Sequence, residues 1–390
     1  MIEVRKVLFR TGDNRACRLF NIRETHRPVK EQKGPVLMIA GVGVRANVFR
    51  PPGQRTLVDC LIEHGYDVWL EDWRACIEWG ASPPHWTHGT SDYIDCGPIP
   101  LSEMDTPPPW PQDQTADKTG EDVLWCLDHA ALYDHPRAVS TVTHITGSAH
   151  IKAIVHCIGS VTFMMAAVAG LVPQVRTIVS NAVSLHPVVP WHTFVKGLLT
   201  RPIVNQFMKY LDAQWGSTEL SPNNLAKLIV WLTQWFHFEC VNPVCKLASF
   251  SYGIGLPGLP VLWRHENLSP EIHDWIKLEF GKVLLRVFDQ LQQALKVGRV
   301  VRLEKLPGLP ADYTANDPKI GDTRIAFFAG ELNACFLKQS QERTFDFFNK
   351  QHRRDYHSLY IVPGYAHLDM FIGKRSAQDV FPLMLAELEK

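Results

Sequence analysis

A cysteine sits at one point in this sequence where it could do covalent chemistry. The stretch AIVHCIGSVTF (residues 153–163) places Cys157 between two apolar runs, as expected where a buried strand turns sharply into a buried helix. A thiolate attacks carbonyl carbon well, and an adjacent base and a helix N-terminus both favour it. A cysteine is also a small hydrophobe that packs well in cores. The rest of the sequence must decide between a nucleophile and a core residue.

The residues around Cys157 favour a nucleophile held on a strained turn. Such a turn needs small residues two positions before and two positions after the nucleophile, because strand and helix approach closely there. Gly159 meets the second requirement, whereas Val155 departs from the first. Ser160 is the alternative nucleophile, but an isoleucine and a threonine would flank it at the matching positions. We therefore predict that Cys157 is the nucleophile.

The elements that must position Cys157 alternate between strand-like and helix-like segments. An antiparallel hairpin is predicted over 4–10 and 17–24, and further strands over 34–44, 67–74, 151–157, 174–183, 322–330 and 356–364. Helices are predicted between them, over 55–66, 135–148, 159–171, 340–351 and 376–390. This alternation predicts an α/β fold with a mostly parallel central sheet flanked by helices.

Two segments interrupt the alternation. Residues 80–122 are rich in proline, glycine and acidic residues and include Trp86 and Trp110, so we predict a long lid-like loop within the core. Residues 185–320 are helix-rich and aromatic, and we predict a helical cap inserted between two strands, with main helices over 229–238 and 272–288. Residues 1–184 and 321–390 then form the core.

Composition limits the classes of function. Lys plus Arg and Asp plus Glu number 40 each in 390 residues, which argues against nucleic acid as a partner. The N-terminus lacks the apolar core of a signal peptide, and no apolar run reaches the roughly 18 residues of a transmembrane helix. Nine cysteines are an odd number in a long chain and indicate reduced thiols, so we expect a cytoplasmic protein. Cys240 and Cys245 have no second cysteine pair after them, so we expect no metal site.

Three motifs together resemble the α/β-hydrolase superfamily over nearly the whole chain. The stretch GYDVWLEDWR is similar to a strand and turn of acid-lipase-type members, HCIGS to their nucleophile elbow, and VPGYAHLD to the turn that carries the catalytic histidine. With NPVC and the C-terminal PGYAHLD…IGK…DVFP, the sequence most resembles hydrolase modules associated with cholesterol-oxidase-type flavoproteins. Polyhydroxyalkanoate synthases share the cysteine at the elbow. The resemblance implies an α/β-hydrolase fold and a flavoprotein oxidoreductase as a possible associate.

The resemblance implies the base and the residue that orients it. His367 follows the last strand where the superfamily places its histidine, whereas His156 is expected to pack or to tune the site. Asn333 stands where the superfamily has its acid, three residues past a glycine, and its amide oxygen can accept the imidazole N–H. Cys-His-Asn is an accepted variant of the triad. Glu331 is the alternative acid, and Asp369 is too close in sequence to His367 to orient it easily.

The oxyanion donors are expected to be backbone N–H groups. Ile158 directly follows the nucleophile, and Val42 follows Gly41 as the superfamily's donor does. The GVG here is not a dinucleotide fingerprint, since no GxGxxG follows, and we expect no cofactor.

Twelve Trp and nineteen Phe predict an apolar pocket between cap and sheet. We therefore expect a cysteine-nucleophile hydrolase (esterase, lipase or thioesterase type) that cleaves an ester or thioester of a bulky lipophilic substrate through an acyl-enzyme. An acyltransferase that uses the same acyl-cysteine is the first alternative. A non-catalytic binding protein with a hydrolase fold is the second.

Overall fold

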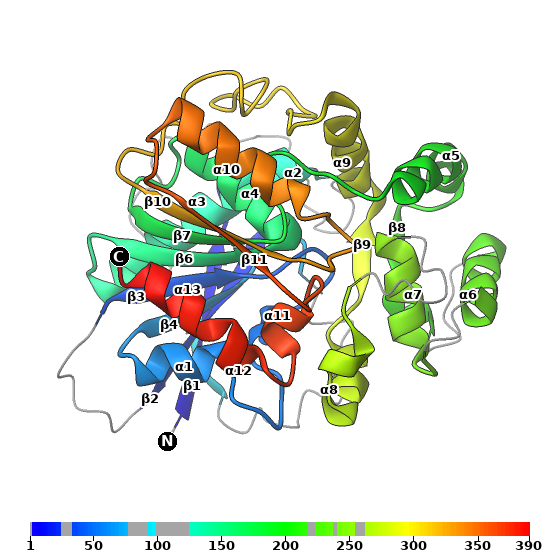
Figure 1. Ribbon diagram of the computed structural model, residues 1–390, viewed down its shortest axis with the longest axis horizontal. Helices are drawn as coiled ribbons and strands as arrows, with labels where there is room; N and C mark the ends of the chain where they lie inside the picture. The colour runs from blue at the N-terminus through cyan, green and yellow to red at the C-terminus, as the bar shows by residue number, and fades with distance from the viewer. Residues whose placement is uncertain are drawn as a thin grey trace.

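The computed structural model describes residues 2–24, 33–76, 93–98, 125–216, 223–236, 240–253 and 262–390. Nine strands form one sheet: β1 (Ile2–Arg10), β2 (Ala16–Glu24), β3 (Pro35–Ile39), β4 (Asp67–Asp72), β5 (Tyr93–Pro98), β6 (Ile151–His156), β7 (Val175–Asn181), β10 (Arg324–Gly330) and β11 (Ser358–Val362). Their order across the sheet is β11-β10-β7-β6-β3-β4-β2-β1-β5 (Figure 1).

The sheet is mostly parallel, with one antiparallel hairpin near its edge. β1 and β2 pair antiparallel over nine residues, and β2 pairs antiparallel with β4, as the predicted hairpin requires. The neighbours β4, β3, β6, β7, β10 and β11 all pair in parallel. Because parallel strands end at one edge of a sheet, the segments after β6, β10 and β11 meet there. These three segments carry Cys157, Asn333 and His367.

Helices cover both faces of the sheet (Figure 1). One face carries α1 (Leu57–Glu63) and α13 (Phe381–Leu388), and the other carries α3 (His135–Thr146), α4 (Cys157–Val168) and α10 (Gln339–Gln351). Every residue of α4 is buried, which explains why its sequence is apolar on all sides. The predicted helices over 159–171, 135–148 and 340–351 therefore correspond to α4, α3 and α10.

Between β7 and β10 the chain leaves the sheet and forms what we call the helical insertion, residues 191–297. It contains α5 (Trp191–Phe207), β8 (Tyr210–Asp212), α6 (Asn224–Phe236), α7 (Pro243–Tyr252), η6 (His265–Asn267), α8 (Pro270–Trp275), β9 (Lys282–Leu284) and α9 (Leu285–Val297). In Figure 1 these elements lie beside the sheet, on the right of the view.

The prediction of one continuous helix over 272–288 is wrong. The chain leaves α8, passes Gly281 and becomes extended in β9, which pairs antiparallel with β8 over three residues. The Gly281 N–H donates to the carbonyl of Gly43 (2.9 Å), so the break also ties the helical insertion to the loop after β3. Apolar periodicity alone could not show this pairing, because its partner strand lies about seventy residues earlier in the chain.

The predicted lid-like loop over 80–122, with Trp86 and Trp110, lies outside the described residues except for β5. Among the helices that the structure describes, none is both long and apolar enough to cross a membrane.

Candidate active site

Cys157 occupies a strained turn between β6 and α4. Its φ of 58° lies in the left-handed region, which non-glycine residues seldom adopt. Two glycines leave room for the turn: a Cβ on Gly159 would lie 2.1 Å from the carbonyl oxygen of Ala40, and one on Gly41 would lie 2.9 Å from the Cβ of Cys157. Val155 is fully buried within β6 and does not prevent the turn. The geometry is that of the strained strand-to-helix turn that the sequence predicts at Cys157.

His367 lies on the loop between β11 and α11 (Asp369–Ile372) and is buried. The Asp369 carboxylate holds this loop by accepting hydrogen bonds from the Ala366 N–H (2.8 Å) and from Asn267 Nδ2 (2.7 Å). Gly330 lets the loop lie against the end of β10, since a Cβ there would meet the carbonyl oxygen of Ala366 at 2.0 Å. Asp369, too near in sequence to orient His367 directly, therefore shapes the loop that carries it.

The structure brings His367 and Cys157 together. One ring nitrogen of His367, one of His156 and the Sγ of Cys157 all lie within 4.8 Å of one another. The two histidine rings are 4.6 Å apart between centroids. Residues predicted from separate parts of the sequence thus form one buried cluster.

Asn333 contacts His367, but not as the sequence predicts. Its Oδ1 accepts the backbone N–H groups of Cys335 and Phe336, both at 3.0 Å, and its Nδ2 lies 3.1 Å from His367 Nδ1. Backbone N–H groups only donate, so this network assigns the oxygen to them and the amide N–H to His367 Nδ1. The neutral imidazole then carries its proton on Nε2. The expected bond from the imidazole N–H to the amide oxygen is absent from this arrangement.

Glu331 is exposed, two residues before Asn333. Its backbone N–H donates to the carbonyl of Val362 (2.9 Å), which continues the pairing of β10 with β11. Of the two alternatives for the third residue, the one in contact with His367 is Asn333.

His156 is anchored by its own amide partner. Its Nδ1 lies 3.2 Å from Asn181 Oδ1, and Asn181 Nδ2 donates to the Met370 sulfur (3.4 Å). The Asn181 oxygen therefore accepts the Nδ1–H of His156. Burial lowers the pKa of His156 to about 3, so this ring is neutral at physiological pH.

Burial also keeps the other two groups of the cluster neutral. It raises the pKa of the Cys157 thiol to about 12, opposed by a hydrogen bond from the Ile158 N–H. It lowers the pKa of His367 well below its usual range, and the neighbouring His156 lowers it further. These shifts favour a thiol beside two neutral imidazoles over a thiolate–imidazolium pair.

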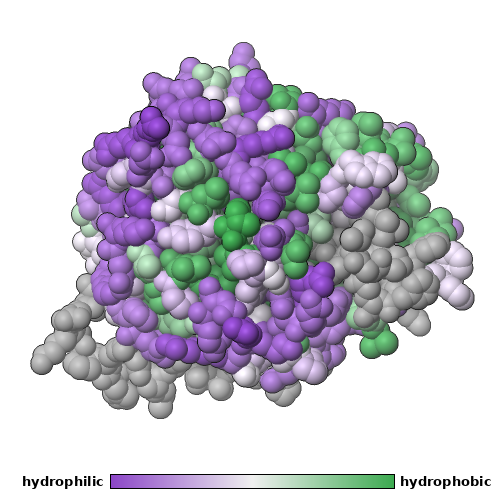
Figure 2. All heavy atoms as spheres, viewed as in Figure 1, coloured by the Kyte–Doolittle hydropathy of each residue, from purple (hydrophilic) through white to green (hydrophobic). Residues whose placement is uncertain are grey.

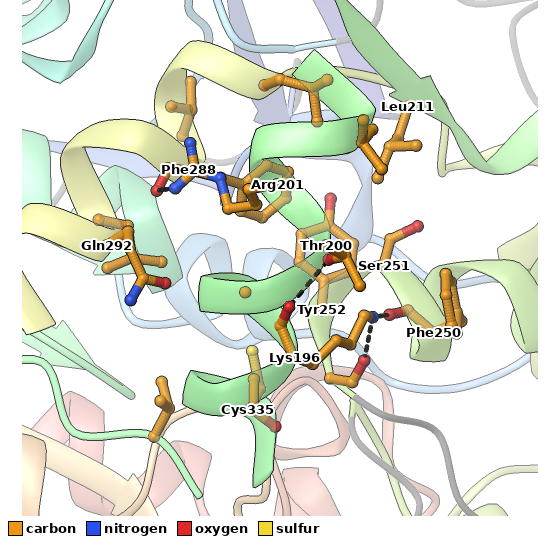
Figure 3. A pocket seen from close by; sticks show the side chains of 18 of the residues that line it. Lys196, Thr200, Arg201, Leu211, Phe250, Ser251, Tyr252, Phe288, Gln292 and Cys335 are labelled. Carbon is orange, nitrogen blue, oxygen red and sulfur yellow. Dashed lines mark hydrogen bonds between the residues drawn. The ribbon is translucent and has the colours of Figure 1, made fainter. Parts of the chain in front are cut away.

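Cys157 opens onto an apolar cavity of about 510 Å³ that also touches Val42 and Ile158, the predicted oxyanion donors. Most of its other lining comes from the helical insertion (Figure 3). Lys196 also lies in this lining, where its Nζ donates to the carbonyls of Phe250 and Gly253 and burial lowers its pKa to about 7. The cavity suits a large apolar ligand.

Tyr252 is a site residue that sequence reasoning missed. Its hydroxyl donates to the carbonyl of Val42 (2.7 Å), and its ring lines the cavity. It thus helps to hold the loop that carries one predicted oxyanion donor. No local signal could have revealed this contact, since the two residues are 210 positions apart.

The helices that line the cavity also expose large apolar side chains to solvent. Four aromatic residues of α5 and α6 are each more than half exposed: Trp191, Phe207, Trp231 and Trp235. Figure 2 shows hydrophobic residues gathered on the side where α5 lies. Patches of this kind are typical of surfaces that meet an apolar partner.

Comparison with solved structures decides the fold. A lipase in its open form matches with a TM-score of 0.53 and 14% identity, over 100% of this chain and 98% of that chain. DcsB, in complex with its substrate analogue, matches with a TM-score of 0.51 and 13% identity, over 100% and 98%. The α/β-hydrolase GrgF from Penicillium sp. sh18 matches with a TM-score of 0.50 and 13% identity, over 98% and 97%. This protein has the α/β-hydrolase fold.

This finding confirms the fold class that the sequence predicts. Neither a protein-family model nor a curated protein sequence matches the chain. At these identities the likeness extends to the fold alone, and activity has to be argued from the site.

Proposed function

We propose that this protein is a hydrolase that uses Cys157 to cleave an ester or thioester of a bulky lipophilic substrate. The observation that carries the proposal is the strained backbone of Cys157, which has a φ of 58°. This residue lies at the N-terminus of α4, beside His367, and lines an apolar cavity. Strain at a buried cysteine is costly and serves no packing purpose, since a cysteine packs equally well in a relaxed conformation.

In the proposed reaction, Cys157 Sγ attacks the substrate carbonyl carbon while its proton passes to His367 Nε2. The backbone N–H groups of Val42 and Ile158 stabilise the oxyanion. The leaving alcohol or thiol takes the proton from His367, which leaves an acyl group on Cys157. Water, activated by His367, then attacks the acyl carbon, releases the free acid and restores the thiol.

Asn333 is a positioning residue in this mechanism, and it limits the rate. To accept the thiol proton at Nε2, the imidazole must hold its other proton on Nδ1. That proton would point at the Asn333 amide N–H, which is a donor and cannot accept it; the two nitrogens, Asn333 Nδ2 and His367 Nδ1, are 3.1 Å apart. The reactive tautomer is therefore the less stable one, so we expect a slow enzyme.

The substrate class follows from the cavity and its surroundings. A cavity of about 510 Å³ with a largely apolar lining accommodates an extended acyl chain or a fused-ring alcohol. We propose that residues 185–320 form the cap that shapes it over a core of residues 1–184 and 321–390. The exposed aromatic residues of α5 and α6 would favour arrival of the substrate from an apolar phase.

The test compares two buried cysteines of the same cavity, Cys157 and Cys335. Cys157→Ala should abolish hydrolysis of p-nitrophenyl esters, and Cys157→Ser should leave weak activity because a hydroxyl needs more basic assistance. Cys335→Ala should remain active. Near-normal turnover by folded Cys157→Ala would show that the nucleophile lies elsewhere.

Product analysis separates hydrolysis from acyl transfer. A hydrolase leaves free acid, whereas an acyltransferase that uses the same acyl-cysteine leaves a new ester when an alcohol is supplied. A cytoplasmic location is part of the proposal, because none of the cysteines whose side chains the structure describes forms a disulfide and the nucleophile must stay reduced. A flavoprotein oxidoreductase as partner is proposed on the sequence resemblance alone.

A further inference from the structure

Four side chains of the helical insertion meet far from Cys157 in sequence and carry only sulfur and nitrogen ligand atoms. Cys240 precedes α7, Cys245 lies in its first turn, His265 begins η6 and His273 lies in α8. One ligand atom from each of the four lies within 4.8 Å of the other three. The sequence shows only the Cys240 and Cys245 pair and predicts no metal site, because the other two residues are histidines spaced more widely than in common zinc motifs.

The separations of the ligand atoms are compatible with one tetrahedral ion. Zn–S bonds of about 2.3 Å and Zn–N bonds of about 2.0 Å place neighbouring ligand atoms roughly 3.3–3.8 Å apart. Cys245 Sγ and His265 Nε2 are 3.4 Å apart. The rings of His265 and His273 meet edge to face, 4.9 Å between centroids.

Neighbouring residues orient the ligands. The Asn242 side-chain oxygen accepts the N–H groups of Val244 and Cys245 (3.1 and 3.2 Å), which caps α7 and fixes Cys245 in its first turn. The Asn242 Nδ2 donates to the carbonyl of His273 (3.0 Å), so one side chain holds two ligands in register. His273 Nε2 is buried and makes no hydrogen bond within the described part of the chain.

We propose that Cys240, Cys245, His265 and His273 bind one zinc ion. Two thiolates and two imidazoles, without a carboxylate, select zinc over calcium or magnesium. Four protein ligands leave no open position for water or substrate, so the site is structural. Binding releases the thiol protons of Cys240 and Cys245, and no redox change occurs.

The zinc site adjoins the segment that holds the His367 loop. The Leu262 carbonyl accepts the Leu368 N–H (2.8 Å), and the Arg264 N–H donates to the Asp369 carboxylate (3.2 Å). Asn267, two residues after the ligand His265, also binds this carboxylate. Zinc would therefore stabilise the segment of the helical insertion that holds the loop after β11.

The first experiment measures metal by mass spectrometry in the full-length protein after dialysis. We expect about one zinc per chain. Cys245→Ser and His273→Gln should lose it. Cys157→Ser should keep it, which is the matched control because Cys157 and its two histidines form another cluster able to hold an ion. Wild-type protein without zinc, or zinc lost only from Cys157→Ser, would overturn the proposal.

The second experiment uses wild-type protein, because a variant that loses a structural metal can unfold. Replacing zinc by Co(II) should give the visible absorption of a tetrahedral site with sulfur-to-cobalt charge transfer. Chelation should then speed amide hydrogen exchange over 262–268 and 364–369. A spectrum without sulfur ligation, or a Cys240–Cys245 disulfide in place of the metal, would refute the site. None of these readouts depends on hydrolysis.

Discussion

Asn333→Asp should make this protein a faster enzyme. In the wild type, Asn333 Nδ2 lies 3.1 Å from His367 Nδ1 and stabilises the tautomer that cannot accept the thiol proton at Nε2. An aspartate in the same place keeps one oxygen for the Cys335 and Phe336 N–H groups, 3.0 Å away. Its second oxygen can accept the Nδ1–H of His367. The substitution thus favours the reactive tautomer and stabilises the imidazolium that forms during attack.

The size of the effect follows from the hydrogen bonds exchanged. A hydrogen bond to a charged group contributes about 1.5–3 kcal/mol, and the opposing neutral bond is lost as well. A gain of roughly 2–3 kcal/mol in the transition state corresponds to about 30- to 150-fold in kcat. KM should change little, because His367 acts on the proton and not on the bound substrate. Asn333→Ala is a poorer probe, since it also removes the acceptor for two backbone N–H groups.

The assay is p-nitrophenyl ester hydrolysis across pH, with folding checked by circular dichroism. Asn181→Asp is the matched control, because it places a carboxylate beside the other buried histidine, His156, at a similar distance. If orientation of His367 is what matters, only Asn333→Asp should gain activity. An equal gain in Asn181→Asp, or a folded Asn333→Asp with no gain, would refute the reasoning.

Three further predictions rest on single contacts. Burial raises the pKa of Cys157 to about 12, so roughly one thiol in 10⁴ is ionised at pH 8. The rate at which iodoacetamide alkylates Cys157 should therefore rise steadily up to pH 10 and beyond. A rate that levels off below pH 7 would instead reveal an ion pair with His367. Burial raises the pKa of Glu279 from 4.5 to about 7, so the folded state binds this proton more tightly and the contribution of Glu279 to stability should fall by about 3 kcal/mol as pH rises from 4.5 to 7. The difference in unfolding free energy between wild type and Glu279→Gln, measured in urea, should change by that amount over this pH range, and a constant difference would contradict the assignment. Tyr252→Phe removes the hydroxyl that donates to the Val42 carbonyl, and it should lower kcat about fivefold, which corresponds to the free energy of one hydrogen bond. An unchanged kcat would mean that this hydroxyl does not support the loop that carries Val42.

Much of the core could be predicted from local sequence, because strands and helices there follow apolar patterns. The hairpin of β1 and β2 and the turn at Cys157 each have a signal within about a dozen residues. The resemblance predicts the positions of His367 and Asn333. The structure places His367 beside Cys157 and Asn333 in contact with His367.

What could not be predicted depends on contacts between distant segments. The orientation of the Asn333 amide is set by the backbone N–H groups of Cys335 and Phe336, whose directions depend on the loop conformation. The break before β9 depends on its pairing with β8. The meeting of Cys240 and Cys245 with two histidines depends on how α7 and α8 pack. The periodicity of apolar residues predicts none of these three features.

The central claim is that Cys157 becomes acylated, and intact-protein mass spectrometry tests it most directly. Wild-type protein mixed briefly with a slowly hydrolysed p-nitrophenyl ester and quenched in acid should gain the mass of one acyl group. Peptide mapping should place that group on Cys157, hydroxylamine should remove it, and Cys157→Ala should not acquire it. No adduct on wild-type protein that nonetheless releases p-nitrophenol, or an adduct that persists in Cys157→Ala, would contradict the account.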